Sequence, residues 1–171
     1  MKILVLNGSP RPSGNTVRLV ERFKKGAESV GHDVSVLQVG TMNIRGCVGC
    51  EFCHTHDQCA IKDDMQKVYD AFQNAEIIVF ACGVYYWSFT PQLQAVISRI
   101  YAIDKPQKAK QYAMILTSAS PNVYDSIVSQ YKSIVSYFGA KDAGIITAFG
   151  AQRKDDNKLE EVYNFGRNIK G

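Results

Sequence analysis

The chain has 171 residues, 46% of them hydrophobic and 21% charged, which suits a folded globular protein and argues against a disordered one. The formal net charge is +4 and no run of Lys and Arg occurs, so we expect no nucleic-acid partner. The longest weakly polar stretch, residues 77–89, is too short to span a bilayer, and the start lacks the apolar region of a signal peptide. We therefore expect no membrane association and a cytoplasmic location.

Short apolar runs alternate with amphipathic segments along the chain. In chain order we expect a strand at residues 2–6, a helix from 15 to about 31, a strand at 33–39 and a loop at 41–61. A helix from 63 to about 72, a strand at 77–81 and a helix beginning at 91 follow. The last predicted elements are a strand at 112–116, a helix at 121–138, a strand at 144–149 and a helix at 155–168.

Five strands that alternate with helices predict a parallel sheet covered on both faces. Right-handed crossovers then give a doubly wound α/β fold, a three-layer sandwich. We expect the flavodoxin-like strand order 2-1-3-4-5. Because no repeat or long linker interrupts the pattern, residues 1–171 are predicted to form a single domain with a Cys-rich loop at about 41–61.

The segment between the first strand and the first helix carries the strongest functional signal. It reads G-S-P-R-P-S-G-N-T, residues 8–16. A loop at this position joins the carboxyl end of a strand to a helix N-terminus, where backbone N–H groups favour phosphate. Its short polar side chains and Arg11 exceed what a helix cap needs, although a capping turn is the alternative. The sequence matches neither the Walker A pattern nor G-x-G-x-x-G, which argues against a dinucleotide-binding Rossmann site.

Residues 1–16 together with 47–65 resemble the flavodoxin-like NADPH-dependent FMN reductase family, especially its iron–sulfur flavoprotein branch. The family loop Gly-Ser-x-Arg-x-x-Gly-Asn-Thr holds the FMN phosphate, which implicates Ser9, Arg11, Ser13, Gly14, Asn15 and Thr16. The resemblance implies an oxidoreductase that passes electrons from NAD(P)H to flavin, a quinone or another small acceptor. FMN would carry the chemistry without a catalytic acid or base from the protein. The resemblance also implies a homodimer or homotetramer.

An aromatic turn, G-V-Y-Y-W-S-F-T at residues 83–90, follows the third strand and lies on the same sheet edge as the phosphate loop. The flavin ring needs apolar or aromatic walls and a few amide partners. We therefore expect flavin contacts from Val84, Tyr85, Tyr86, Trp87 and Ser88, with a core or subunit-contact role for the aromatics as the alternative. Family members have a proline where this chain has Gly83. Thr117 and Ser118, after the fourth strand, are further candidates for flavin contact.

Four of the five cysteines, Cys47, Cys50, Cys53 and Cys59, share one loop. Closely spaced thiolates suit a tetrahedral metal or an iron–sulfur cluster, and the resemblance implies a [4Fe–4S] cluster that exchanges electrons with FMN. His54 and His56 leave zinc with mixed ligands open, and thiols without metal are a third interpretation. Cys82, in the third strand, is expected in the core.

Two alternative functions stay open at this point. The first is an iron–sulfur flavoprotein electron carrier, in which FMN and the cluster relay electrons between proteins. The second is a non-catalytic zinc-binding regulator without flavin.

Three charged residues are expected to be structural. The family has a Lys-x-x-x-Asp-Arg pattern where this chain has Gln94, Ser98 and Arg99. We therefore expect Arg99 to have lost the family ion pair. Asp63 and Asp64 are expected to cap the following helix rather than act as an acid–base pair.

Overall fold

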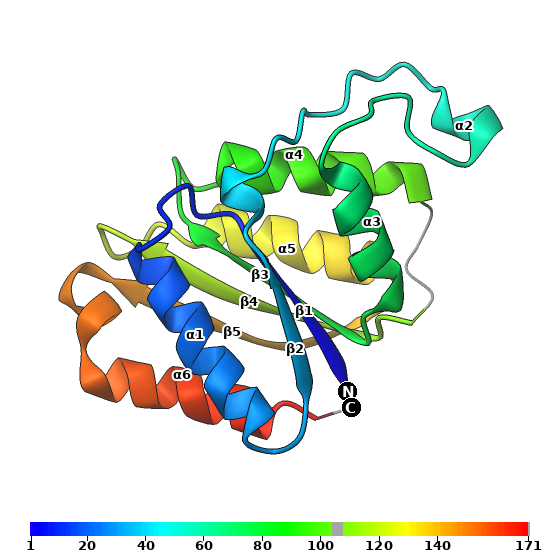
Figure 1. Ribbon diagram of the computed structural model, residues 1–171. Helices are drawn as coiled ribbons and strands as arrows, with labels where there is room; N and C mark the ends of the chain where they lie inside the picture. Colours follow the sequence, from blue (N-terminus) through cyan, green and yellow to red (C-terminus); the bar gives the residue numbers. More distant parts are fainter. Residues whose placement is uncertain (104–107, 171) are drawn as a thin grey trace.

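A computed structural model describes residues 1–103 and 108–170 (Figure 1). At its centre lies a five-stranded sheet in the order β2-β1-β3-β4-β5, with every neighbouring pair parallel. The strands are β1 (Lys2–Asn7), β2 (Asp33–Leu37), β3 (Ile77–Gly83), β4 (Gln111–Ser118) and β5 (Lys141–Phe149). The flavodoxin-like topology predicted from the sequence is therefore confirmed.

The helices divide between the two faces of the sheet (Figure 1). Helices α1 (Asn15–Glu28) and α6 (Asp156–Asn168) cover one face, and α3 (Met65–Asn74), α4 (Pro91–Ile100) and α5 (Asp125–Tyr137) cover the other. Short elements are α2 (Cys53–His56) and the 3-10 turns η1 (Val39–Thr41), η2 (Tyr101–Ile103) and η3 (Gly150–Lys154). Across the described residues, none of these helices has the length and apolar character needed to cross a lipid bilayer.

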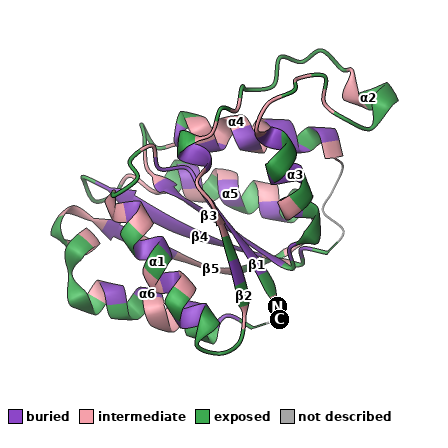
Figure 2. Ribbon diagram, viewed as in Figure 1, coloured by how far each residue is buried: buried purple, intermediate pink, exposed green. Residues whose placement is uncertain are grey.

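The core consists of two apolar layers, one on each face of the sheet (Figure 2). Along β1, Ile3 and Val5 pack toward α1 and α6, whereas Leu4 and Leu6 pack toward α3, α4 and α5. Successive side chains on a strand point to opposite faces, so a strand buried on both faces reads as a continuous apolar run. This explains why β1, β3 and β4 could be predicted from apolar runs without an alternating pattern.

Several element boundaries differ from the prediction by a few residues. The helix expected from residue 121 begins at Asp125, because Asn122 has a φ of +59°, which a right-handed helix cannot include. The second strand ends at Leu37 instead of residue 39, since the chain turns into η1. The loop expected at 41–61 also contains the short helix α2.

Cys82 lies in the core, as predicted, with none of its surface exposed. Burial raises the pKa of its thiol from 9.0 to about 12, so the thiol stays neutral well above neutral pH. Cys47 and Cys50 are exposed, and Cys53 and Cys59 are partly exposed.

We expect a thiol reagent at pH 8 to modify the four loop cysteines of the folded, metal-free protein and to spare Cys82 until the chain unfolds. The number of thiols that react, measured from the released chromophore before and after denaturant is added, checks this. Modification of all five thiols in the folded protein at one rate would contradict it. The protection of Cys82 should weaken only as the pH rises from about 9 toward 12. In this range the Cys82 thiol ionises in the unfolded chain before it ionises in the folded protein, so a rising pH favours unfolding.

Candidate functional site

Three loops meet at the carboxyl edge of the sheet, where β1 and β3 lie side by side and the strand order reverses. Thr16 at the start of α1 shares a hydrogen bond of 2.7 Å with Thr117 at the end of β4. The Val84 N–H donates to the Thr117 carbonyl at 2.8 Å, and the Thr90 hydroxyl donates to the Gly8 carbonyl at 2.8 Å. The structure therefore brings together the loops after β1, β3 and β4 that the sequence singled out.

The loop after β1 is held in shape by its own hydrogen bonds. The Ser9 N–H donates to Asn7 Oδ1 at 3.0 Å, and the Arg11 N–H donates to the Ser9 hydroxyl at 3.3 Å. The Gly14 N–H closes a turn on the Arg11 carbonyl at 3.1 Å. The side chains of Arg11 and Ser13 are exposed at this edge, so the backbone is ordered while two polar groups stay accessible.

The N-terminus of α1 has no protein cap. Its N-cap residue is Gly14, which offers no side chain, and the first turn contains no acidic residue. In contrast, Asp155 caps α6 by accepting from the N–H groups of Asn157 and Lys158. The uncapped N–H groups of α1 and the helix dipole favour an anion at this end. The phosphate of FMN has the charge that this end of the helix can bind.

Sequence reasoning missed Gly40, which supports the phosphate loop from η1. A side chain at Gly40 would overlap the backbone carbonyl of Ser9. Gly8 is similarly confined, because its Cβ would lie 2.6 Å from Leu93 Cβ and 2.7 Å from the Thr90 hydroxyl. In the sequence, the only available signal was a glycine after a predicted strand. That signal does not reveal which backbone segment packs against the glycine.

The aromatic turn is a two-residue hairpin with unusual backbone angles. Tyr85 and Ser88 exchange two N–H···O=C bonds of 3.0 Å. The residues between them, Tyr86 and Trp87, have φ values of +46° and +61°, as in a type I′ turn, which normally favours Asn and Gly. Large side chains in this conformation are strained, and such strain concentrates at functional sites. The turn leaves Tyr86 95% exposed and Trp87 49% exposed beside the phosphate loop.

Several groups predicted to contact flavin already have protein partners. In the turn, the N–H groups of Val84, Tyr85 and Ser88 are used, which leaves those of Tyr86 and Trp87 without a partner among the described residues. The Ser118 hydroxyl bonds the Ser120 carbonyl and the Tyr124 hydroxyl, both at 2.6 Å.

The cysteine loop lies at the opposite end of α4 from the phosphate loop (Figure 1). Thr90, the N-cap residue of α4, bonds Gly8, whereas Ser98, near the end of α4, accepts from the Cys47 N–H at 3.2 Å. Because α4 has ten residues, its two ends are about 15 Å apart. Within one chain, the two predicted sites are therefore separate.

All four loop cysteines line one small cavity of about 30 Å³. Gly49, Glu51 and Asp57 adopt positive φ values, which bend the loop around this cavity. The cavity has about the volume of one water molecule. Over residues 1–103 and 108–170, no three Cys, His, Asp or Glu side chains already form a metal-binding group.

The two histidines of the loop contact aromatic residues. His54 Nε2 lies 3.1 Å from the Tyr101 hydroxyl, and the ring of His56 stacks on Phe52 with centroids 3.7 Å apart. Neither histidine lines the cysteine cavity. The cavity therefore offers the four cysteines and Glu51 as possible ligands, rather than the mixed Cys/His set that a zinc site was expected to use.

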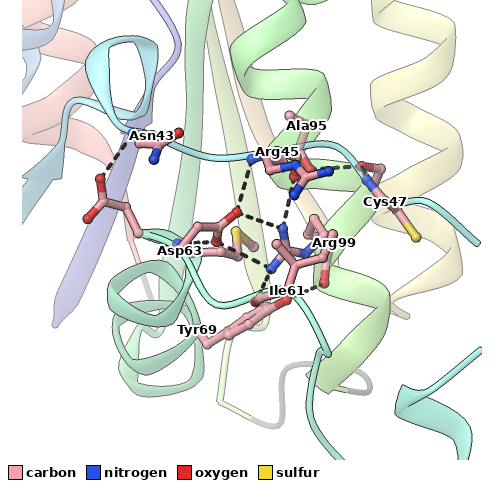
Figure 3. A network of polar contacts seen from close by, with 11 residues as sticks. Asn43, Arg45, Cys47, Ile61, Asp63, Tyr69, Ala95 and Arg99 are labelled. Carbon is pink, nitrogen blue, oxygen red and sulfur yellow. Dashed lines mark hydrogen bonds and ion pairs between the residues drawn. The ribbon is translucent and has the colours of Figure 1, made fainter. Parts of the chain in front are cut away.

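Arg99 has an ion pair, contrary to our expectation (Figure 3). Asp63 replaces the missing family partner, at 3.0 Å from the Arg99 guanidinium, and both side chains are buried. Burial alone would raise the pKa of Asp63, but hydrogen bonds from Arg99 and from two backbone N–H groups hold that pKa below its ordinary value.

The predicted capping role of Asp63 and Asp64 is only partly correct. Asp63 accepts from the Met65 N–H at 3.0 Å, but Asp64 makes no side-chain cap and instead accepts from the Asn43 N–H at 3.0 Å. The two carboxylates join the beginning of the cysteine loop to its end.

Comparison with known proteins agrees with this geometry. The family model described as NADPH-dependent FMN reductase matches residues 1–153. An iron–sulfur flavoprotein of Archaeoglobus fulgidus is 25% identical over 99% of this chain and 79% of its own length. An iron–sulfur flavoprotein of Methanocaldococcus jannaschii is also 25% identical, over 99% of this chain and 95% of its own length.

Solved structures show the same fold at low identity. An NAD(P)H:quinone oxidoreductase from Methanothermobacter marburgensis superposes with a TM-score of 0.82 at 15% identity, covering 100% of this chain and 96% of that one. An FMN-dependent NADH-azoreductase from Bacillus anthracis, in complex with FMN, gives 0.69 at 12% identity, covering 97% and 95%. Together with the family match over residues 1–153, the loops at the sheet edge show that this chain belongs to the NADPH-dependent FMN reductase family, as a flavin-dependent oxidoreductase related to the iron–sulfur flavoproteins.

Proposed function

We propose that the chain holds FMN at the carboxyl edge of its sheet and passes electrons from NAD(P)H to a small acceptor such as a quinone or free flavin. The observation that carries this proposal is the uncapped N-terminus of α1 behind an ordered polar loop. FMN supplies the electron transfer between nicotinamide and acceptor. The protein binds the cofactor, orients its ring and leaves one side accessible.

The phosphate would be bound by N–H groups of the first turn of α1 and by side chains of the loop before it. Those residues are Ser9, Arg11, Ser13, Gly14, Asn15 and Thr16. Arg11 is exposed and can add a charge-assisted bond to a phosphate oxygen. Thr16 is buried and bonded to Thr117, so its main contribution is to hold the edge of the sheet together.

The flavin ring would lie against the strained turn. Tyr86 and Trp87 offer aromatic surface and two N–H groups that have no partner within residues 1–103 and 108–170. Val84, Tyr85 and Ser88 shape the turn through their backbone bonds, and the Thr117 carbonyl supports it from β4. The Ser118 hydroxyl is instead bonded to Ser120 and Tyr124. Donors near the ring would stabilise the added negative charge of reduced flavin.

Binding of FMN tests this assignment directly. Quenching of FMN fluorescence on titration with the folded protein should saturate, and Arg11→Ala should weaken the affinity about tenfold, since a charge-assisted bond is lost. Arg18→Ala removes the same charge from an exposed position one turn along α1 and serves as the matched control. Absence of saturable quenching, or equal losses in both variants, would contradict the proposed phosphate site.

A second function is favoured by the cysteine cavity. We propose that Cys47, Cys50, Cys53 and Cys59 hold a [4Fe–4S] cluster, so that the chain also relays single electrons. Support comes from the shared cavity and from curated relatives named as iron–sulfur flavoproteins. Iron and sulfide analysis of anaerobically purified protein tests this proposal, and a preparation with zinc and no flavin would instead favour the regulator.

The assembly and location of the protein are further proposals. A homodimer or homotetramer is supported by the exposed rings of Tyr86, Trp87 and Tyr101 and by the separation of the two sites within one chain. Light scattering of the purified protein measures the number of chains directly. A cytoplasmic location is supported by the four clustered thiols, which stay reduced there.

A further inference from the structure

Arg99 connects the end of α4 to both ends of the cysteine loop (Figure 3). Its Nη1 donates to the Arg45 carbonyl at 2.9 Å, and its Nη2 donates to the Ile61 carbonyl at 3.0 Å. Arg45 precedes the first loop cysteine and Ile61 follows the last one. A single guanidinium therefore closes the segment that carries all four cysteines.

Asp63 holds this guanidinium in place. Its two oxygens accept from Nη1 and Nη2 of Arg99 at 3.0 and 3.3 Å, and one of them also accepts from the Arg45 N–H at 3.0 Å. The side chains of Arg99 and Asp63 are only 1% and 4% exposed, so water cannot readily compete for these bonds. The planar fork of arginine matches a carboxylate in a way that lysine cannot. We name the pair the Arg99–Asp63 clasp.

The clasp lies directly beside the cysteines. Arg99 and Ser98 both line the cavity that the four thiols share, and Ser98 also accepts from the Cys47 N–H at 3.2 Å. In contrast, residues 46–51 and 54–58 are all exposed, so most of the loop has little packing of its own. The loop therefore depends on the end of α4 for its position.

We propose that Arg99, held by Asp63, is a positioning residue that presents Cys47, Cys50, Cys53 and Cys59 to one metal group. Ligands that are arranged before binding lose less conformational freedom when the metal arrives, so they bind it more tightly. The inference rests on the proposed iron–sulfur site and adds to it the residue that organises the ligands.

Titration of metal-free protein with Co²⁺ under anaerobic conditions tests the clasp, because thiolate-bound Co²⁺ absorbs strongly and needs no flavin turnover. Arg99→Met should weaken Co²⁺ binding at least about tenfold, as loss of outer-shell partners typically does. Arg99→Lys keeps the charge without the fork and should recover only part of the affinity. Iron and sulfide per chain after anaerobic reconstitution should fall in the same order.

Arg22→Met is the matched control, because it removes an arginine that pairs with Glu160 at 3.2 Å on the other face of the sheet. It should leave Co²⁺ binding unchanged. FMN affinity should survive in the Arg99 variants, since the flavin loops lie at the far end of α4. If Arg99→Met does not fold, Arg99→Lys and Ser98→Ala carry the test, the latter with a loss of a few fold because it removes only the acceptor for the Cys47 N–H.

Two outcomes would overturn the clasp alone: wild-type Co²⁺ affinity in the Arg99 variants, or equal losses of Co²⁺ and FMN affinity, which indicate general unfolding. Wild-type protein that binds FMN but takes up neither Co²⁺ nor iron would overturn the cysteine site, and the clasp with it. The failures of the two proposals are thus distinguishable.

Discussion

Gly166→Ala is expected to lower the free energy of unfolding by about 2–3 kcal/mol, even though alanine is ordinarily the better helix former by about 1 kcal/mol. The reason is the crossing of α1 and α6 beneath the sheet. A Cβ at Gly166 would overlap the Phe23 carbonyl, and a Cβ at Gly26 would overlap the Tyr163 carbonyl. The two backbones touch directly, so an added methyl group must push the helices apart.

Thermal unfolding measures this effect, and we expect a midpoint lower by roughly 5–10 °C for a chain of this size. Gly26→Ala should behave in the same way. Glu21→Ala, at an exposed position on α1, is the control and should change the unfolding free energy by less than about 0.5 kcal/mol. A stabilised Gly166→Ala variant would show that the two helices can separate without loss of core packing.

Gly40→Ala is expected to weaken FMN binding about tenfold to a hundredfold, although Gly40 lies outside the phosphate loop in the sequence. Its new side chain would meet the backbone of Ser9 and Gly8, so the loop or η1 has to move. A displaced loop can no longer direct its polar groups and the N-terminus of α1 at one phosphate.

Fluorescence titration with FMN measures the loss, and circular dichroism shows whether the fold is kept. Gly46→Ala is a matched control, because a Cβ at Gly46 meets nothing within 4 Å. Should Gly40→Ala bind FMN as tightly as the wild type, η1 would not support the phosphate loop in the way that we infer.

The sequence alone was enough to predict the order of strands and helices and to place a polar loop, for which we propose phosphate binding, at the carboxyl edge of the sheet. Both depend on neighbouring residues: apolar runs mark buried strands, and a Ser- and Arg-containing loop before a helix marks an anion site. Asn122 shows the limit of this local reasoning, since its left-handed backbone delays α5 and no residue pattern announced it.

Contacts between distant segments were decided only by the tertiary structure. Gly40 against Ser9, Arg99 against Asp63, and the distance along α4 between the cysteines and the flavin loops all join residues far apart in the chain. We inferred a lost ion pair for Arg99 because we looked for its partner within the same helix. A buried charge requires a partner but does not specify where in the chain it lies, so only the packing of α4 against the cysteine loop could identify Asp63.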